Sequence, residues 1–203
     1  MTDLNPALSF TLFDSAVGCC AVVWNERGVT GVRFLEGDER ATRDRIARRF
    51  PTARETVPPK EIQRAIDGIV ALLGGELTDL SGVEVDTTGM PDFNRQVYEI
   101  ARTIPAGSTL TYGEIAERLG DRNLARDVGT ALGQNPIPII VPCHRVLAAD
   151  GKLGGFSAPG GLSTKARLLT IEGAQPGGRT LFDSLPLTAP RRPPNHPSRR
   201  RSA

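Results

Sequence analysis

The sequence lacks any long uninterrupted run of apolar residues. A membrane-spanning helix needs about 20 predominantly apolar residues, and these 203 residues contain no uncharged apolar stretch of even about 18. The first ten residues, MTDLNPALSF, also lack the basic segment followed by an apolar run that marks a secretory signal. These absences predict a cytoplasmic protein that has no membrane partner.

Cysteine and histidine are both scarce. Three cysteines cannot form a disulfide framework, and the odd count indicates reduced thiols. The two histidines, His144 and His196, are too few for most zinc motifs, so we expect no metal site. Cys19 and Cys20 are adjacent in an apolar run that favours a strand, where their side chains would point to opposite faces. We therefore predict that both are buried structural thiols.

Net charge is small but unevenly distributed. The formal net charge is +2 at neutral pH. Residues 175–203 carry six arginines and a single acid, Asp183, so residues 1–174 are mildly acidic. Overall charge therefore gives no indication of a nucleic-acid partner. The same C-terminal residues include six prolines, and we predict a disordered tail that either adds weak attraction to phosphates or has no role.

Residues 1–88 are expected to form a small α+β domain with an antiparallel sheet. Three short segments within residues 8–35 are continuously apolar or alternate between apolar and polar residues, as β-strands do. Two helices are expected at residues 38–50 and 60–74, the second with apolar residues at helical spacing. A linker near Gly82–Met90 would separate this domain from the rest.

Residues 89–174 are expected to form a mainly helical domain. Asp92 is a candidate cap for a helix over residues 93–103. Two short helices, at residues 111–120 and 124–134, are then joined by a tight turn, which is the outline of a helix-turn-helix. Helix pairs that only pack a core are commoner, so the outline alone does not establish DNA binding.

An irregular segment precedes the last predicted helix, which spans residues 163–172 with Ser163 as its N-cap. Three of the seven residues 136–142 are proline, which excludes a helix interior or a central strand. The residues between the prolines are apolar, so we expect the segment to be buried and rigid. Because buried irregular backbone is costly, such a segment often positions a functional group, and Cys143 follows directly.

Cys143 is followed by His144, and this pair has two explanations. A thiol is mostly protonated at neutral pH, and a nearby base or positive charge raises the thiolate fraction that attacks an electrophile. The alternative is a buried small thiol beside a core histidine with no chemical role. The two residues alone favour this simpler alternative.

The wider sequence resembles the O6-alkylguanine-DNA alkyltransferases, also called methylated-DNA–protein-cysteine methyltransferases. Their most specific motif, Pro-Cys-His-Arg-Val, stands unbroken at residues 142–146. The resemblance covers residues 90–174 strongly and residues 1–89 only in general form. Other similar segments occur in the same order: TLTYGEIAERLG (109–120), ARDVGTALGQNP (125–136), GGF-S (154–157) and KARLLTIEG (165–173).

The resemblance implies a single-turnover DNA repair reaction. Cys143 would accept an alkyl group from guanine O6, and from thymine O4, and would keep it as a thioether. His144 would act as the base through a water molecule, with its imidazole held by Glu172. Asn135 would tie the turn before the cysteine segment, and Arg145 would support the loop electrostatically. The family chemistry requires no cofactor and no metal.

The resemblance also implies a partner, namely double-stranded DNA that carries O6-alkylguanine. The second helix of the helix-turn-helix would enter the minor groove, and the damaged base would be flipped out of the duplex. Arg126 would fill the space that the base leaves, and Tyr112 would contact the backbone and the base. A ribonuclease-H-like N-terminal domain and a monomer able to bind DNA cooperatively are also implied. The substrate-binding set would be completed by Pro138, Arg145, Val146, Phe156 and Ser157.

Two other functions remain open at this point. A non-catalytic protein that binds alkylated DNA lesions could share this fold, although such relatives lack the cysteine. A thiol hydrolase could use Cys143, His144 and Glu172. The hydrolase would leave both the helix-turn-helix outline and the proline-rich approach to the thiol unexplained.

Overall fold

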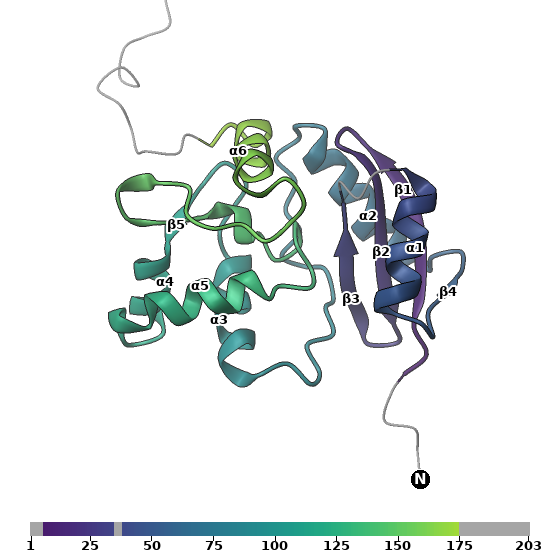
Figure 1. Cartoon of the computed structure of the whole chain (residues 1–203), viewed down its shortest axis with the longest axis horizontal. Coiled ribbons are helices and arrows are strands. Elements are labelled where there is room, and N and C mark those ends of the chain that lie inside the picture. Colours follow the sequence, from purple (N-terminus) through teal and green to yellow (C-terminus); the bar gives the residue numbers. More distant parts are fainter. Residues whose placement is uncertain (1–5, 35–37, 175–203) are drawn as a thin grey trace, which may run out of the picture.

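The computed structural model describes residues 6–34 and 38–174, so the predicted tail at 175–203 lies outside the described residues. A β-sheet occupies one side of the molecule and a group of short helices the other (Figure 1). The predicted α+β class with an antiparallel sheet is confirmed. Among the described residues, no helix is both long enough and apolar enough to cross a bilayer.

The sheet is an antiparallel meander with one added parallel edge. Strand order is β3-β2-β1-β4, and the last pairing, between β1 and β4, is the parallel one. Side chains alternate between the two faces of β2, so Cys20 joins one apolar cluster while Ala21 and Val23 join another. Cys19 and Cys20 are both buried, as predicted. The strands are β1 (Ser9–Ser15), β2 (Gly18–Asn25), β3 (Gly28–Arg33) and β4 (Arg54–Glu55).

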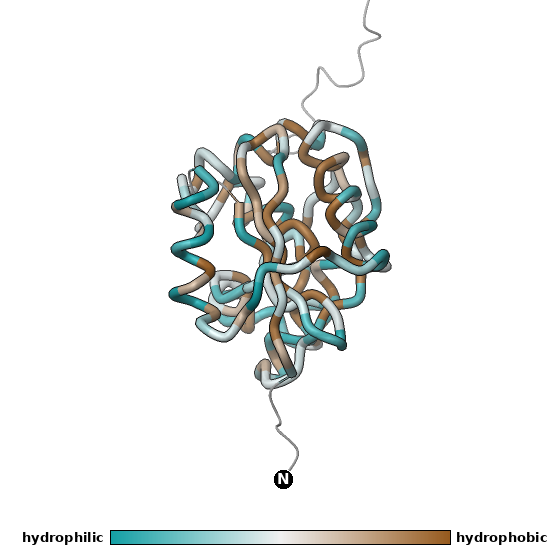
Figure 2. Tube along the Cα trace, turned by 90° about the vertical axis from the view of Figure 1, so that its right-hand side faces the viewer, coloured by the Kyte–Doolittle hydropathy of each residue, from teal (hydrophilic) through white to brown (hydrophobic). Residues whose placement is uncertain are grey.

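Two helices cover opposite faces of this sheet. In Figure 2 the mostly hydrophilic α1 (Glu39–Arg49) lies on one side of the strands and α2 (Lys60–Leu73), with its apolar stripe, on the other. The side chain of Asp38 caps α1 by accepting a hydrogen bond from a backbone amide. Only Thr42 and Ile46 of α1 are buried, so its outer surface is free to carry charge.

Strand β3 is an edge strand that later segments of the chain, near Glu84 and Pro136, cover. The Val29 amide donates to the Glu84 carbonyl at 2.9 Å, and the Val32 amide donates to the Pro136 carbonyl at 3.0 Å. Gly28 is required here, because its φ is +133° and a Cβ atom would lie 2.6 Å from the Glu84 oxygen. One apolar core consequently runs from the sheet into the helical half without interruption.

The C-terminal half consists of short helices and turns, and two predicted caps were wrong. Asp92 is the first residue of α3, whose N-cap is Pro91, and Ser163 lies inside α6, which begins after Gly160 in a left-handed conformation. Thr111 does cap its helix and forms a capping box with Glu114. The elements are α3 (Asp92–Arg102), β5 (Leu110–Thr111), α4 (Tyr112–Arg118), η1 (Arg122–Leu124), α5 (Ala125–Gly133), η2 (Cys143–Arg145), β6 (Val146–Leu147), η3 (Ala149–Gly151) and α6 (Gly161–Ile171).

Candidate active site

The proline-rich segment ends in the single helical turn η2, which presents Cys143. Asn135 fixes the start of the segment: its side chain donates to the Val141 carbonyl at 2.8 Å and accepts from the Ile137 amide at 3.0 Å. Ile139 has a φ of +75°, which is rare for a β-branched residue and costs on the order of 1–3 kcal/mol. The surrounding packing therefore holds strained backbone four residues before the thiol.

A short parallel pairing brings a second segment beside this turn. Strand β5 pairs with β6, which directly follows η2, and α4 begins at Tyr112, directly after β5. The Tyr112 hydroxyl donates to the Gly155 carbonyl at 3.4 Å. Gly154 has a φ of +66°, and a Cβ atom there would lie 3.0 Å from the Tyr112 ring, so only glycine lets the loop pass so close.

Cys143 lies between two cavities. The larger, about 560 Å³, opens between α5 and the loop that carries Phe156 and Ser157, and both Tyr112 and Arg126 line it. The smaller, about 170 Å³, lies toward β3 and is lined by Asn135 and Pro138 among others. Cys143, Phe156 and Ser157 line both. Cys143 is only 8% exposed as a residue, so a ligand must enter one of these cavities to reach its sulfur.

Most of the predicted substrate-binding residues therefore surround one sulfur atom, but two do not. Arg145 lines neither cavity, since its guanidinium is buried behind the cysteine turn. Arg145 instead contacts Glu172, and its predicted part in substrate binding stays a prediction. Val146 is also fully buried, and its carbonyl accepts from the Lys165 ammonium at 2.5 Å. Because a carbonyl has two lone pairs, that oxygen can accept a second donor.

A buried ionic cluster lies beside the thiol. His144 Nε2 lies 2.8 Å from Glu172 Oε1. Arg145 donates from Nε to Glu172 Oε2 at 2.8 Å and from Nη2 to Oε1 at 2.9 Å, and its Nη1 donates to the Ile104 carbonyl at 2.6 Å. The three side chains are at most 7% exposed. A carboxylate with this many donors is held in one orientation.

The cluster fixes the protonation of the histidine. Burial lowers the pKa of His144 in spite of the adjacent carboxylate, so the imidazole is neutral at pH 7. Burial alone would raise the pKa of Glu172, but hydrogen bonds from His144 and Arg145 outweigh it and lower that pKa to about 2. An ionised Glu172 can only accept, so Nε2 carries the imidazole proton. Nδ1 is buried, has no partner among the described residues, and keeps a free lone pair.

Lys165 is a site residue that the sequence reasoning missed. It lies on α6, is fully buried, and places its ammonium 5.7 Å from the centre of the Tyr112 ring. Burial lowers the pKa of Lys165 to about 8, and the adjacent Cys143 opposes that shift. The available signal was its position one helical turn before Leu168 and Leu169, which places a lysine on the inward face of the helix.

The thiol itself is under opposing influences. Burial raises the pKa of Cys143, whereas a hydrogen bond from the Asn135 side chain and the positive charge of Lys165 lower it. The raised pKa means that the resting group is a thiol and not a thiolate. The site thus combines a protonated nucleophile, a neutral base with a free lone pair and a buried cation.

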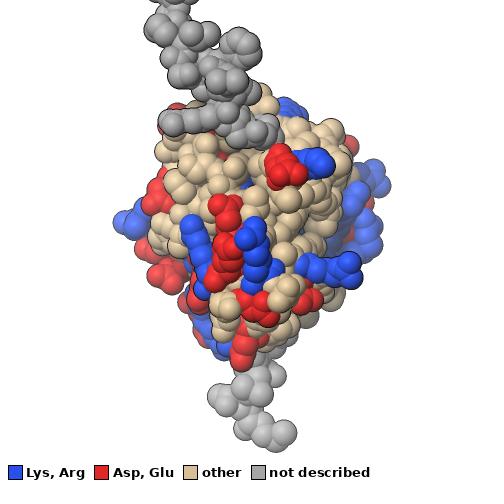
Figure 3. All heavy atoms as spheres, turned by 90° about the vertical axis from the view of Figure 1, so that its left-hand side faces the viewer, with Lys and Arg blue, Asp and Glu red and all other residues tan. Residues whose placement is uncertain are grey.

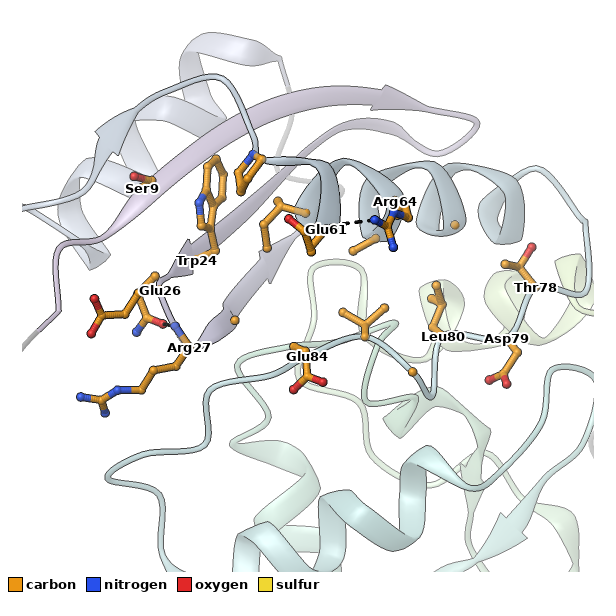
Figure 4. A pocket seen from close by; sticks show the side chains of 18 of the residues that line it. Ser9, Trp24, Glu26, Arg27, Glu61, Arg64, Thr78, Asp79, Leu80 and Glu84 are labelled. Carbon is orange, nitrogen blue, oxygen red and sulfur yellow. Dashed lines mark hydrogen bonds and ion pairs between the residues drawn. The ribbon is translucent and has the colours of Figure 1, made fainter.

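A cleft larger than either of these two cavities lies away from this chemistry. It has a volume of about 760 Å³ and runs between α2 and the segment at residues 78–84, with Trp24 and Arg27 toward one end and Asp79 at the other (Figure 4). Neither Cys143 nor its ionic cluster lines it. No group of three His, Cys, Asp or Glu side chains within residues 6–34 and 38–174 could hold a metal ion.

Comparisons with known proteins agree with this geometry. Residues 92–174 match the family described as 6-O-methylguanine DNA methyltransferase, DNA binding domain. A methylated-DNA–protein-cysteine methyltransferase of Mycobacterium tuberculosis is 38% identical over 177 residues, which span 87% of this chain and 99% of that protein. A protein of the same name from Methanothermobacter thermautotrophicus is 37% identical over 158 residues, covering 78% of this chain and 81% of that one.

Solved structures point the same way. The crystal structure of Mycobacterium tuberculosis OGT in complex with DNA superimposes with a TM-score of 0.66 at 38% identity, covering 81% of this chain and 92% of that one. O6-methylguanine-DNA methyltransferase from Pyrococcus kodakaraensis gives 0.59 at 27% identity, with 82% and 99% covered. The fold and the buried thiol are therefore those of a DNA alkyltransferase. The chain belongs to the methylated-DNA–protein-cysteine methyltransferase family.

Proposed function

We propose that this chain repairs DNA by direct reversal, transferring an alkyl group from guanine O6, and from thymine O4, to Cys143 in one irreversible turnover. The observation that carries the proposal is a buried thiol that lines two cavities, next in sequence to a neutral histidine held by a carboxylate. The relatives named above are methyltransferases that act on methylated DNA and a protein cysteine.

The proton of the thiol has a defined destination. His144 Nδ1 carries the free lone pair, and a water molecule can bridge it to the sulfur. Protonation of Nδ1 creates an imidazolium, which the Glu172 carboxylate stabilises through Nε2–H at 2.8 Å. The buried Lys165 ammonium stabilises the thiolate that forms. Deprotonation thus transfers a proton from the sulfur to His144 within a preorganised buried site, and the charges that stabilise this transfer belong to the protein and not to solvent.

The transfer itself is a displacement at the alkyl carbon. The sulfur–carbon bond forms while the bond from carbon to guanine O6 breaks, and the departing guanine takes up the proton that the thiol lost. In this proposal the amide of Ser157, a residue that lines both cavities, donates to O6 as charge develops there. The product is a thioether, which the site has no means to hydrolyse, so each molecule acts once.

The DNA partner is assigned to α4, η1 and α5 acting as a helix-turn-helix, with α5 in the minor groove. Gly129 and Gly133 of α5 line the larger cavity, and small residues allow the helix to approach a groove closely. Arg126 is exposed near the start of α5 and lines the same cavity. A base inside a duplex cannot reach a buried sulfur, so the damaged nucleotide is flipped into that cavity while Arg126 fills its place.

The remaining parts of the proposal concern organisation. Residues 1–88 form a ribonuclease-H-like domain and residues 89–174 the domain that binds DNA and accepts the alkyl group. The protein acts as a monomer that can bind DNA cooperatively. The antiparallel order β3-β2-β1 supports the first assignment. The second is supported by the position of His144 and Glu172, which both follow residue 89.

One experiment tests this function. The protein is mixed with excess duplex DNA that carries radiolabelled O6-methylguanine, and label is followed into protein over time. The account expects one label per protein molecule, after which transfer stops and unmodified guanine is recovered in the DNA. Tight binding without label transfer would identify a non-catalytic lesion binder. Continued release of small labelled products would identify a hydrolase.

A further inference from the structure

The turn between α3 and β5 lies against the buried ionic cluster, and we call its residues 104–108 the cluster turn. Figure 3, which shows the left-hand side of Figure 1, shows basic and acidic side chains interspersed over the outer surface of the helical half, where solvent screens them. A buried carboxylate lacks that solvent and depends on donors from the protein. The cluster turn contacts two members of the cluster. The Ile104 carbonyl accepts from Arg145 Nη1 at 2.6 Å, and the Gly107 amide donates to Glu172 Oε2 at 3.4 Å.

The Gly107 amide completes the set of donors around the Glu172 carboxylate. An ionised carboxylate offers about four lone-pair positions, two on each oxygen. Oε1 lies within hydrogen-bond distance of His144 Nε2 and Arg145 Nη2, and Oε2 accepts from Arg145 Nε. Among the described residues the Gly107 amide is the fourth N–H group in this set, and it is the one that belongs to the main chain. The carboxylate therefore cannot rotate toward either side chain without losing a donor.

The backbone conformation of the cluster turn directs this amide. The Ser108 amide donates to the Pro105 carbonyl at 3.1 Å, and Gly107 has a φ of +79° whereas Ala106 has no positive φ. These features define a type II turn, in which the central peptide is turned over relative to a type I turn. An N–H group thus faces Glu172 where a type I turn would place a carbonyl oxygen. A Cβ atom on Gly107 would also lie 3.0 Å from the Glu172 backbone oxygen, so glycine suits both the turn and the close approach.

We propose that Gly107 is a positioning residue for alkyl transfer, whose amide holds the Glu172 carboxylate in the orientation that stabilises the His144 imidazolium. The inference rests on the proposed function, because it takes His144 to be the proton acceptor. Gly107 lines neither cavity at Cys143, so it acts through Glu172 and not on the ligand. The imidazolium exists only during transfer. The amide therefore contributes to the rate of the chemical step and not to binding of the damaged base.

The substitution Gly107→Ala tests this role in the full chain. Alanine disfavours a positive φ, so the cluster turn should change to type I and direct the Ala106 carbonyl oxygen toward Glu172. The rate constant for transfer from saturating free O6-benzylguanine should fall by about tenfold, as is typical when a group that orients a reacting residue is lost. The concentration of O6-benzylguanine that gives half this rate should stay at its wild-type value. A turn that only supports the fold would change neither quantity per folded molecule.

The matched control is Gly89→Ala, in a second turn of the same kind. The Met90 amide donates to the Thr87 carbonyl at 3.1 Å, and Gly89 has a φ of +78°. A Cβ atom on Gly89 would meet no described atom within 4 Å. Both substitutions place alanine at the same unfavourable φ, so both should lower stability, but only Gly107→Ala should slow transfer. Equal transfer rate constants for the two variants, measured where both are folded, would overturn the proposal.

A second substitution, Gly107→Asn, keeps the proposal testable if alanine prevents folding. Asparagine adopts a positive φ more readily than alanine, so the amide should keep its direction. Its Cβ atom still crowds the Glu172 backbone, because the space at Gly107 is only 3.0 Å deep on that side. The transfer rate constant should therefore lie between those of the wild type and Gly107→Ala, with an unchanged half-saturating concentration. A raised half-saturating concentration would instead assign Gly107 to ligand binding and overturn the proposal.

The pH dependence of stability separates this inference from the proposed function. A donor to a carboxylate lowers its pKa, so loss of the Gly107 amide should bring the folded-state pKa of Glu172 closer to its ordinary value. The fall in unfolding free energy between pH 4.5 and 2 should then be shallower in Gly107→Ala than in Gly89→Ala. If the wild-type chain failed to transfer alkyl groups, the proposed function would fail. An equal pH dependence of stability in the two variants would overturn the link between Gly107 and Glu172 alone.

Discussion

The two halves of the molecule are built on different principles. The N-terminal half is regular: three strands of six to eight residues form an antiparallel sheet, and two helices cover its opposite faces. The C-terminal half has short helices, a strained isoleucine and an ionic cluster at the centre of its fold. Regular elements bury apolar area efficiently, whereas irregular buried backbone can present a reactive group at a fixed position.

The difference shows how one half depends on the other. The proline-rich segment would leave backbone groups unpaired if it stood alone, and the edge of β3 supplies one of the missing partners at Pro136. The sheet therefore stabilises the segment that positions Cys143. Changes at the Cys143 site should therefore reduce chemistry, and changes in the core of the N-terminal half should reduce stability.

The largest effect on chemistry is expected from removing the sulfur of Cys143. Cys143→Ala should abolish alkyl transfer, because the hydroxyls that line the two cavities, such as those of Tyr112 and Ser157, are much weaker nucleophiles than a thiolate. Duplex binding should remain, since the sulfur makes no phosphate contact. Label transfer and gel-shift measurements on the same preparation check both outcomes. Residual transfer to this variant would mean that the acceptor lies elsewhere.

The next effect combines chemistry and stability. Glu172→Gln leaves Arg145 buried without a counter-charge and removes the negative charge beside His144, which should cost about 3–5 kcal/mol of unfolding free energy. Transfer to free O6-benzylguanine should also slow strongly, because no anion would then stabilise the imidazolium. Urea unfolding and stopped-time transfer assays measure the two losses. A variant with normal stability would show that the cluster contributes little.

The pH dependence of stability follows from the same residue. The folded state lowers the pKa of Glu172 from its ordinary value of 4.5 to about 2, chiefly because His144 and Arg145 outweigh the opposing effect of burial. The carboxylate therefore contributes stability above pH 4.5, and this contribution disappears as the pH falls toward 2. Unfolding free energy should drop across that window in the wild type. Glu172→Gln should show a shallower drop.

A smaller effect should separate DNA handling from chemistry. Arg126→Ala should slow repair of duplex DNA by about tenfold to a hundredfold, because flipping a base costs a few kcal/mol and the arginine compensates part of it. Reaction with free O6-benzylguanine should be unchanged, since that base needs no flipping. Equal slowing with both substrates would assign Arg126 to the chemistry of the site.

A core substitution in the N-terminal half should lower stability without slowing alkyl transfer. Ile46 of α1 is 1% exposed and packs with Phe10 and Val23, so Ile46→Ala should cost about 2–4 kcal/mol of stability. The transfer rate per folded molecule should not change, because these residues touch neither cavity at Cys143. Chemical denaturation and label transfer below the unfolding transition provide the measurement. A slower transfer rate would break the proposed separation between the halves.

The smallest effect concerns the tail. Deleting residues 176–203 should leave reaction with free O6-benzylguanine unchanged, since every described site residue precedes residue 174. At low salt the affinity for duplex DNA should fall slightly, because six arginines are lost. Reaction rates and binding at two salt concentrations test this. A loss of transfer to the free base would implicate the tail in the site.

Local sequence patterns predicted the helices and strands better than the residues at which the helices begin. Alternation and helical spacing gave the three strands and the positions of α1 and α2. The caps proposed at Asp92 and Ser163 were wrong, because a proline and a left-handed glycine provide those helix starts. The residue that caps a helix depends on the conformation of the chain that enters it, and a local sequence pattern does not contain that conformation.

Long-range contacts account for what the sequence could not predict at the site. The partnership of Arg145 with Glu172 joins residues 27 positions apart, and the β5–β6 pairing that places Tyr112 joins segments that no periodicity connects. Lys165 was missed because a lysine on a helix is ordinarily solvent-exposed. The family motif predicted which residues would gather, and their chemical roles stay predictions.

Mass spectrometry of the protein after incubation with O6-methylguanine duplex tests the central claim most directly. Peptide mapping should find one added methyl group on Cys143 and none on Cys19 or Cys20, which are buried in the sheet and serve as internal controls. Folded protein whose Cys143 peptide kept its original mass, while damaged DNA was present in excess, would contradict the account.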